Sequence, residues 1–299
     1  MIAAWNARAV LEPCLDSLEA QDWPGELDVV VVDDASTDST PELLGERTGI
    51  RSVRNPEPVG YCAAINQGAE LARGDVVLLC NSDVEFVNPD SVRRLVEELG
   101  RPGVGLVAPR YVRPDGTAQP GLARFPGIGR ALVVNLGLHR LMPDRLKARI
   151  APEHSSHAHS RDADWLMGAV IGIDTALFRE LGGYWALMYA SEEDLAWRVG
   201  LRGLRTRFVA DSLVVHVGNF SNRQRWSDPD RAARVACSEL VFLDTHYGRL
   251  RAGAIRAITW AGAIARVPIL RLSGRAGRAA EYRATARVYR RGSDSPLES

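Results

Sequence analysis

The chain is 299 residues long, enough for one large α/β domain or for a domain of about 200–240 residues with an appendage. Its residues are 46% hydrophobic and 25% charged, a composition that excludes a wholly disordered chain, a collagen-like chain and a polytopic membrane protein. The 37 basic and 37 acidic residues cancel, so net charge gives no reason to expect a nucleic-acid partner.

The first third of the chain alternates strand-like and helix-like patterns. An all-valine run between acids predicts a strand buried on both faces, and later segments repeat the alternation. The predicted strands cover 28–34, 76–80 and 104–108, and the predicted helices cover 61–73 and 89–99. Such repeats predict an α/β fold, an open and mostly parallel sheet with helices on both faces.

The first strand of this sheet has little sequence available. Only residues 1–4 precede the helix pattern that carries Val10, Leu11, Cys14, Leu15 and Leu18. Either the strand is short, or the printed start lies inside a longer reading frame. Because the first strand of such a sheet is normally central and longer, we expect the second, a truncated strand.

The pattern dissolves from 115 to about 160 and then resumes. A strand-like run over 164–173 precedes a short helix ended by Gly182-Gly183, a helix over 191–201 and a last strand over 208–216. The irregular region contains His154, His157 and His159, which we interpret as solvated loop residues rather than a metal cluster. The four cysteines are widely spaced without a CxxC pair, which predicts free, mostly buried thiols.

The C-terminal part, 223–299, is predicted to be a separate helical, arginine-rich extension with a disordered end, after a first domain over 1–222. Residues 245–291 hold eleven arginines and one acid, Glu281. A helix over 252–272 mixes arginine with bulky apolar residues and Trp260, which suits contact with an anionic membrane surface through 250–291. A helix packed on the main domain with a solvated arginine face explains the pattern equally well. No run of 18 uninterrupted apolar residues predicts an obvious membrane span.

Polar residues follow three of the predicted strands. Asp33 and Asp34 end the valine strand, Asn81-Ser82-Asp83 ends the next, and His216 ends the last. Ligands of open α/β sheets bind outside the carboxyl ends of the strands. Carboxylates there suit a hard divalent cation, and a cation suits a phosphorylated ligand. The chain has no GxxxxGK[ST] loop and no GxGxxG after the first strand, which disfavours P-loop and nicotinamide sites.

Four stretches, in order, resemble family-2 glycosyltransferases with the A-type nucleotide-sugar fold, close to a bacterial rhamnosyltransferase-like branch. They are Ala3-Ala4-Trp5-Asn6, 31–38 with its adjacent acids, 55–83 ending in Asn81-Ser82-Asp83, and 168–198 with Gly182-Gly183 and Glu192-Glu193-Asp194. The resemblance covers about 1–222. The family usually has acids after the double glycine, where this chain has Tyr184-Trp185-Ala186.

The resemblance implies a donor site and a metal site. Asp34 would hydrogen-bond the donor's pyrimidine, with Asp33 beside it. Asp83 would hold a divalent cation, Mg²⁺ or Mn²⁺, with His216 as a further ligand, and Asn81 replaces the usual first acid. The implied donor-binding residues are Ala3, Trp5, Asn6, Asp33, Asp34, Asn66, Asn81 and Ser82.

The resemblance also implies a general base for attack by the acceptor hydroxyl. Glu192 is the preferred candidate, while Glu193 and Asp194 stay open, since acids at a helix start also stabilise the helix dipole. Crowded like charges raise at least one pKa. The implied acceptor-binding residues are Trp165, Gly168, Tyr184 and Trp185, with a core role for Trp185 equally open.

The expected function is therefore an inverting, metal-dependent transfer of a sugar, rhamnose by analogy, from a nucleoside-diphosphate sugar. The expected acceptor is a lipid-linked saccharide or polysaccharide in cell-envelope synthesis, reached from the cytoplasm at the inner face of the membrane. The alternative is a non-catalytic nucleotide-sugar-binding or scaffold protein of the same fold. A nucleotidyltransferase is disfavoured because no basic phosphate-binding loop follows the first strand position.

Overall fold

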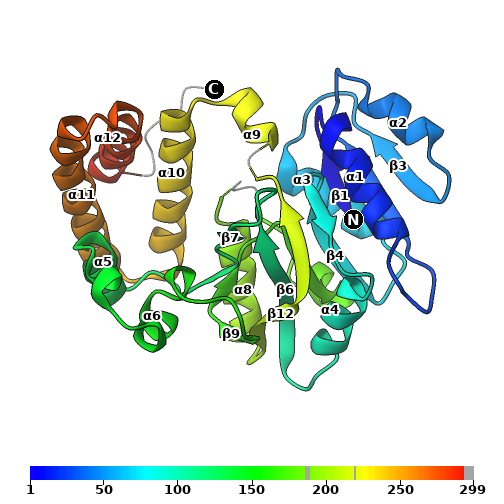
Figure 1. The fold of residues 1–299 in the computed structure, drawn as a ribbon, viewed down its shortest axis with the longest axis horizontal. Helices are drawn as coiled ribbons and strands as arrows, with labels where there is room; N and C mark the ends of the chain where they lie inside the picture. The colour runs from blue at the N-terminus through cyan, green and yellow to red at the C-terminus, as the bar shows by residue number, and fades with distance from the viewer. Residues whose placement is uncertain (186–188, 219, 293–299) are drawn as a thin grey trace. The chain divides into compact units, whose positions relative to one another are not determined.

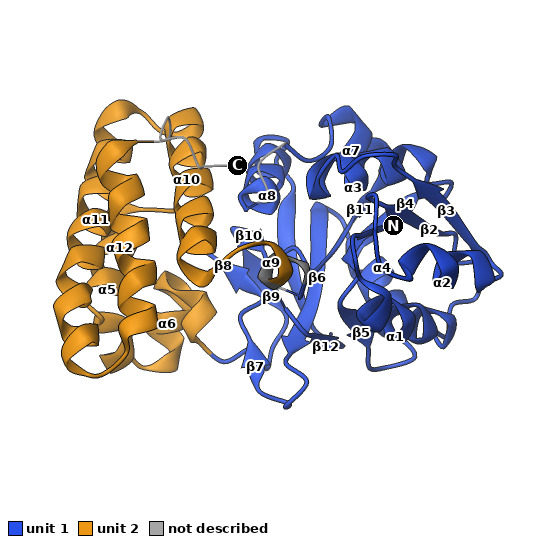
Figure 2. Cartoon of the chain, turned by 90° about the horizontal axis from the view of Figure 1, so that it is seen from above, with its two compact units in different colours: residues 1–123, 156–221 blue, residues 124–155, 222–299 orange. Residues whose placement is uncertain are grey.

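A computed structural model describes residues 1–185, 189–218 and 220–292. It divides into two compact units (Figure 2). Unit 1 contains Met1–Ala123 and Ser156–Ser221, and unit 2 contains Arg124–Ser155 and Asn222–Ser299. Unit 2 therefore combines the C-terminal extension with residues 124–155, which the sequence analysis assigned to the first domain.

Unit 1 is built around one large sheet (Figure 1). Its main path follows the order β3-β2-β1-β4-β11-β6-β12-β5, in which β1 to β4 run parallel and β12 runs parallel to β6. The strands are β1 (Ile2–Ala4), β2 (Val29–Asp33), β3 (Ile50–Arg54), β4 (Val76–Asn81), β5 (Val84–Phe86), β6 (Val104–Val112), β7 (Ala118–Gln119), β9 (Arg161–Ala163), β11 (Val170–Asp174) and β12 (Arg205–His216). The predicted mostly parallel sheet is confirmed.

The predicted strand over 164–173 is two separate strands, β10 (Trp165–Leu166) and β11, preceded by the short β9. β9 pairs with β12, β10 pairs with β8 (Leu122–Ala123) in a small second sheet, and β11 enters the main sheet. β11 runs antiparallel to both β4 and β6. Met167 to Ala169 separate β10 from β11. The Tyr111 hydroxyl on β6 holds the start of β11, because it accepts from Val170 N and donates to Val170 O, both at 2.9 Å.

Helices cover the sheet because its valine and leucine side chains alternate between the faces. Val31 packs in a core cluster with residues of α1 and α4. Its neighbours Val30 and Val32 point to the opposite face of the sheet and are also buried. Both faces of the sheet are therefore covered. The helices of unit 1 are α1 (Arg8–Glu19), α2 (Thr40–Glu46), α3 (Tyr61–Leu71), α4 (Ser91–Leu99), α7 (Thr175–Glu180) and α8 (Ser191–Leu201).

The three-residue β1 is central, pairing with β2 on one side and β4 on the other. The terminal ammonium donates to Leu78 O at 2.9 Å. As predicted, the cysteines are free: Cys14, Cys62 and Cys80 are buried and Cys237 is half-buried.

Unit 2 is helical. It contains α5 (Ile128–Asn135), the short helices η1 (Leu138–Leu141) and η2 (Pro152–His154), α6 (Asp144–Ile150), α10 (Asp228–His246), α11 (Arg249–Leu272) and α12 (Ala276–Arg291), while α9 (Phe220–Arg225) crosses the boundary between the units. Among the described residues, α11 is one helix long and apolar enough to cross a membrane by length and composition alone. Its apolar character is interrupted by arginines, which is why no uninterrupted run signals it in the sequence.

Candidate functional site

The ends of β4 and β12 meet at the carboxyl edge of the sheet. Asp83 follows β4, His216 ends β12, and Asp83 Oδ1 lies 3.4 Å from His216 Nε2. Both side chains are buried. The two residues are 133 positions apart, so the sheet topology brings together the predicted metal ligands.

Asp83 is ionised despite its burial. Burial alone raises its pKa, but the His216 ring and two backbone N–H groups outweigh that effect and hold the pKa below the usual value. Asp83 Oδ2 accepts from Gly218 N at 3.0 Å and from Phe220 N at 3.5 Å. The carboxylate is therefore charged at neutral pH and held by the chain that leaves β12.

The other side of the His216 ring contacts Gln119 of β7, a residue that the sequence analysis missed. Gln119 Nε2 lies 3.1 Å from His216 Nδ1, and Asn81 Nδ2 lies 3.5 Å from Nε2. Tyr111 packs against the ring with centroids 5.9 Å apart. Gln119 Oε1 is buried without a hydrogen-bond partner. Since β7 is a two-residue strand after an irregular loop, no periodicity marks Gln119.

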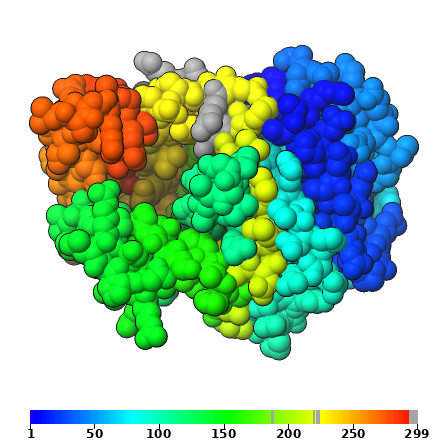
Figure 3. All heavy atoms as spheres, in the orientation of Figure 1, coloured from blue at the N-terminus to red at the C-terminus, as the bar shows by residue number. Residues whose placement is uncertain are grey.

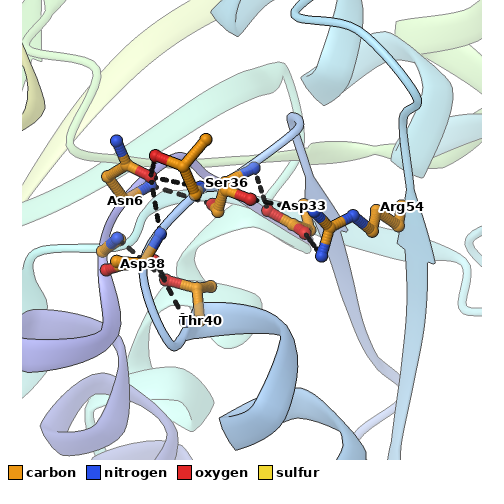
Figure 4. Close-up of polar contacts among 8 residues, drawn as sticks. Asn6, Asp33, Ser36, Asp38, Thr40 and Arg54 are labelled. Carbon is orange, nitrogen blue, oxygen red and sulfur yellow. Dashed lines mark hydrogen bonds and ion pairs between the residues drawn. The ribbon is translucent and has the colours of Figure 1, made fainter.

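Asn6 organises the loop that follows β2 (Figure 4). Its side-chain oxygen accepts from Thr37 N at 2.7 Å and from Asp38 N at 3.3 Å, and its own N–H donates to Ser36 Oγ. Asn6 has φ +47°, a left-handed conformation that asparagine tolerates better than most residues. This predicted donor residue thus shapes a loop at the edge of the sheet.

The two acids after β2 have different partners. Asp33 accepts from Ser36 N at 3.0 Å and forms an ion pair with Arg54 at 3.6 Å (Figure 4). Asp34 accepts from Val59 N at 2.8 Å and from Gly60 N at 2.9 Å. Asp34 therefore fastens the start of α3 to the end of β2, so its carboxylate is already engaged by the protein.

Glu192 lies in the first turn of α8 and packs against Gly168. A Cβ at residue 168 would lie 2.0 Å from Glu192 Oε1 and 2.3 Å from Cγ, so only glycine leaves room for this carboxyl. Burial raises the pKa of Glu192 to about 7. A carboxyl with this pKa can accept a proton near neutral pH.

Tyr61 and Tyr184 lie within electrostatic reach of Glu192. The hydroxyls of Tyr61 and Tyr184 are buried without hydrogen-bond partners, and their rings stack with centroids 6.4 Å apart. Burial, and next the charge of Glu192, raises the pKa of both well above the usual value. Asp83 also raises the pKa of Tyr61, so Tyr61 lies within electrostatic reach of both carboxylates.

The other acids of α8 face the interior. Asp194 is fully buried and pairs with Arg198 at 2.5 Å. Arg198 also donates to Leu181 O and Gly183 O at 2.7 and 2.8 Å, which anchors the Gly182-Gly183 turn. Glu193 is also buried. Of the three candidate bases, Asp194 is therefore engaged by Arg198, whereas Glu192 occupies the space beside Gly168.

Asn66 of α3 contacts protein backbone. Its amide donates to Tyr184 O at 2.9 Å and accepts from Tyr184 N at 2.8 Å. A Cβ at residue 183 would lie 2.4 Å from Asn66 Oδ1, so Gly183 permits this approach. Asn66, predicted to bind the donor, fixes the loop that carries Tyr184.

The remaining predicted residues differ in burial. Ala3, Trp5, Trp165 and Trp185 are half-buried and Ser82 is buried. The histidines of the irregular region form no metal cluster, and the described residues contain no group of three or more His, Cys, Asp or Glu that could hold an ion.

A cavity of about 330 Å³ lies by the amino ends of β2 and β4, apart from the predicted site. Its lining includes Trp23, Leu27 and Val76.

Replacing Glu192 by glutamine should stabilise the folded protein at high pH. The folded state holds this proton more tightly than the unfolded chain, so ionising Glu192 destabilises the fold as pH rises from about 4.5 to about 7. We expect Glu192→Gln to increase the free energy of unfolding by about 2–3 kcal/mol at pH 8, and by little at pH 4.

Urea denaturation of both proteins between pH 4 and pH 8 measures this difference. Glu180→Gln, an exposed position on α7, serves as the control and should change little. A stability difference for Glu192→Gln that is the same at every pH would contradict the raised pKa.

Comparison with known proteins identifies the family of the chain. The model of the glycosyl transferase family 2 matches residues 1–163. O-antigen biosynthesis protein RfbC of Myxococcus xanthus is 28% identical over 229 residues, 72% of this chain and 17% of that protein. An uncharacterised protein, y4gI, of Sinorhizobium fredii is 34% identical over 133 residues, 41% of this chain and 15% of that protein. The chain thus spans less than a fifth of the length of either relative.

Among solved structures, a mannosyltransferase from Pyrobaculum calidifontis, in complex with GDP-Man and Mn²⁺, shares the fold with a TM-score of 0.63 at 19% identity. The match covers 95% of this chain and 84% of that one. Since the family model spans more than half of the sequence, the chain belongs to glycosyl transferase family 2.

Proposed function

We propose that the protein transfers a sugar from a nucleoside-diphosphate sugar to a saccharide acceptor, with a divalent cation and with inversion at the anomeric carbon. One observation carries the proposal: Asp83, paired with His216, and Glu192, with its raised pKa, lie within electrostatic reach of the same tyrosine. This supports a cation site and a candidate base that serve the same reaction.

Asp83 and His216 fit a divalent cation. Their facing atoms are 3.4 Å apart, close to the roughly 3 Å between neighbouring ligands in an octahedral shell with bonds of about 2.1 Å. The unpartnered Oε1 of Gln119 supports this fit. With the amide turned over, Oε1 accepts a hydrogen bond from His216 Nδ1–H, which leaves Nε2 free to bind a metal. A bound cation would neutralise charge on the leaving diphosphate.

Glu192 would remove the proton from the attacking acceptor hydroxyl. Its pKa near 7 matches the working pH of a general base, an effect typically worth about 10²–10⁴-fold in rate. Transfer should therefore rise with pH up to about 7 and then level off. The hydroxyls of Tyr61 and Tyr184, which have no hydrogen-bond partner in the protein, would be available to a substrate hydroxyl if substrate binding exposes them.

The donor and acceptor are narrower proposals. The name of the Myxococcus relative supports polysaccharide synthesis, and the bound GDP-Man of the structural relative supports a nucleotide-sugar donor. Rhamnose as the sugar rests on the branch that the sequence resembles. We assign the acceptor as a lipid-linked saccharide at the cytoplasmic face of the cell membrane.

A non-catalytic nucleotide-sugar-binding protein is the second candidate. Asn81 favours it, because an amide stands where the family usually has the first acid of its metal motif, so the described site offers the cation fewer carboxylates. Binding of nucleotide and Mn²⁺ without turnover on any acceptor would establish this alternative.

Two variants test the proposed roles by activity. Glu192→Gln should lower sugar transfer at least about 100-fold while nucleoside-diphosphate binding stays unchanged. Asp83→Asn should weaken binding of Mn²⁺ and nucleotide together. Release of nucleotide measures transfer and calorimetry measures binding.

Glu180→Gln and Asp211→Asn are the exposed controls for these variants. Full transfer by both site variants would refute the assignments.

Two substitutions of Gln119 test its role. Gln119→Met removes the acceptor for His216 Nδ1 at similar size and should weaken Mn²⁺ binding about 10–100-fold. Gln119→Glu keeps an acceptor and should retain binding. Electron paramagnetic resonance of free Mn²⁺ in titrations with nucleoside diphosphate reports the affinity.

The ¹⁵N shifts of the His216 ring report its tautomer in the same proteins. Equal Mn²⁺ affinity in Gln119→Met and the unmodified protein would show that Gln119 has no part in metal binding. A lack of Mn²⁺ binding in the unmodified protein would instead refute the metal site itself.

A further inference from the structure

The solvent-facing side of α11 is apolar. Its exposed residues recur at spacings of three and four along more than half of the helix, which places them on one face. From 257 to 272 they are Ala257, Trp260, Ala261, Ile264, Ala265, Pro268, Ile269 and Leu272, with Arg271 as the one charged residue among them. Leu272 is 91% exposed and Ile269 65%. A helix on the surface of a soluble domain normally presents charged residues there.

A second apolar stripe lies on α5 and η1. Ile128, Leu132 and Leu136 are all exposed and four residues apart, so they share one side of α5. Leu138 and Leu141 of η1 continue the exposed apolar surface, and Leu141 is 86% exposed. No acidic residue occurs between Arg124 and Pro143.

The two stripes belong to one packed structure. Arg266 of α11 donates to Val134 O at 2.9 Å and to Asn135 O at 2.8 Å, at the C-terminus of α5. A Cβ at residue 262 would lie 2.3 Å from Asn135 Oδ1, so Gly262 allows α5 to approach α11 closely. Figure 3 shows α5 and η1 in green beside α11 in orange. We call the exposed residues of both stripes the apolar surface of unit 2.

The charge of α11 and α12 selects the partner, while α10, which packs on α12, has four acids and two arginines. α11 contains five arginines and no acid, and α12 adds five arginines against Glu281. An apolar helix face flanked by arginines complements an anionic bilayer. The arginines contact lipid phosphates, and the apolar side chains enter the boundary between the headgroups and the acyl chains.

The contacts of two arginines within α11 favour a helix that lies on the bilayer over one that crosses it. Arg256 donates to Tyr289 O of α12 at 2.6 Å, and Arg266 binds the carbonyls of α5. The opposite side of α11 is packed through buried residues such as Ile255, Ala263 and Val267. Crossing a membrane would require α11 to leave these partners.

We propose that the apolar surface of unit 2 inserts into the interfacial layer of an anionic lipid bilayer, with α5 and η1 entering beside α11. This inference rests on the proposed function in one respect: a lipid-linked acceptor would explain why the protein binds a membrane. It stands on residues that take no part in the candidate active site.

Vesicle co-sedimentation of the full chain tests the inference. The protein should bind vesicles of phosphatidylcholine with 30% phosphatidylglycerol more tightly than phosphatidylcholine alone. The variant Leu136→Ser/Trp260→Ser/Ile264→Ser should bind the anionic vesicles at least about 10-fold more weakly. Leu201→Ser, at a position 73% exposed in unit 1, is the control and should bind normally. Circular dichroism confirms that all variants are folded.

The other outcomes overturn the inference. Equal binding by the triple variant would show that this surface is not the contact. Concentration-dependent dimers in sedimentation velocity, lost in the triple variant and without vesicle binding, would make the occupant a second copy. Resistance to alkaline carbonate extraction from cell membranes would show that α11 spans the membrane.

Transfer of sugar to a water-soluble acceptor separates this inference from the proposed function. It should be unchanged in the triple variant. If the unmodified protein transfers no sugar, only the proposed function is refuted.

Discussion

The contact between Asp83 and His216 is the constraint on which the site depends. Main-chain and side-chain bonds join the end of β4 to the end of β12: Val217 N donates to Asp83 O, Gly218 N donates to its carboxylate, and His216 faces Oδ1. A buried carboxylate this well hydrogen-bonded stays ionised. The fold thus maintains a negative charge at the carboxyl edge of its sheet, where a cation and a diphosphate would bind.

The other buried acids show how the same residue type is divided between structure and chemistry. Asp34 is engaged by the backbone that opens α3, and Asp194 by Arg198. Glu192 differs because burial raises its pKa to about 7, and Gly168 provides the space it occupies. A protein that keeps a carboxyl group in so unfavourable an environment loses stability, which is expected where the group has a catalytic role.

Much of this could be predicted from the sequence. The buried valine run predicts its strand, and the polar residues after β2, β4 and β12 predict the edge where Asp83 and His216 meet. The antiparallel direction of β11 could not be predicted, since a buried strand has the same pattern in either direction. Gln119 could not be found either, because its importance depends on a contact between distant segments. Gly168 was predicted as an acceptor residue, but the room that it leaves for Glu192 could not be predicted. Apolar periodicity in α5 and α11 predicts a helical face but does not say whether it faces a core or a bilayer.

Anomalous diffraction at the manganese edge tests the central claim most directly, on crystals grown with Mn²⁺ and a nucleoside diphosphate. The account predicts a single strong peak within about 2.0–2.6 Å of both Asp83 Oδ1 and His216 Nε2, with the diphosphate completing the shell. A peak coordinated by Asp33 or Asp34 instead, with Asp83 still bonded only to protein, would contradict it.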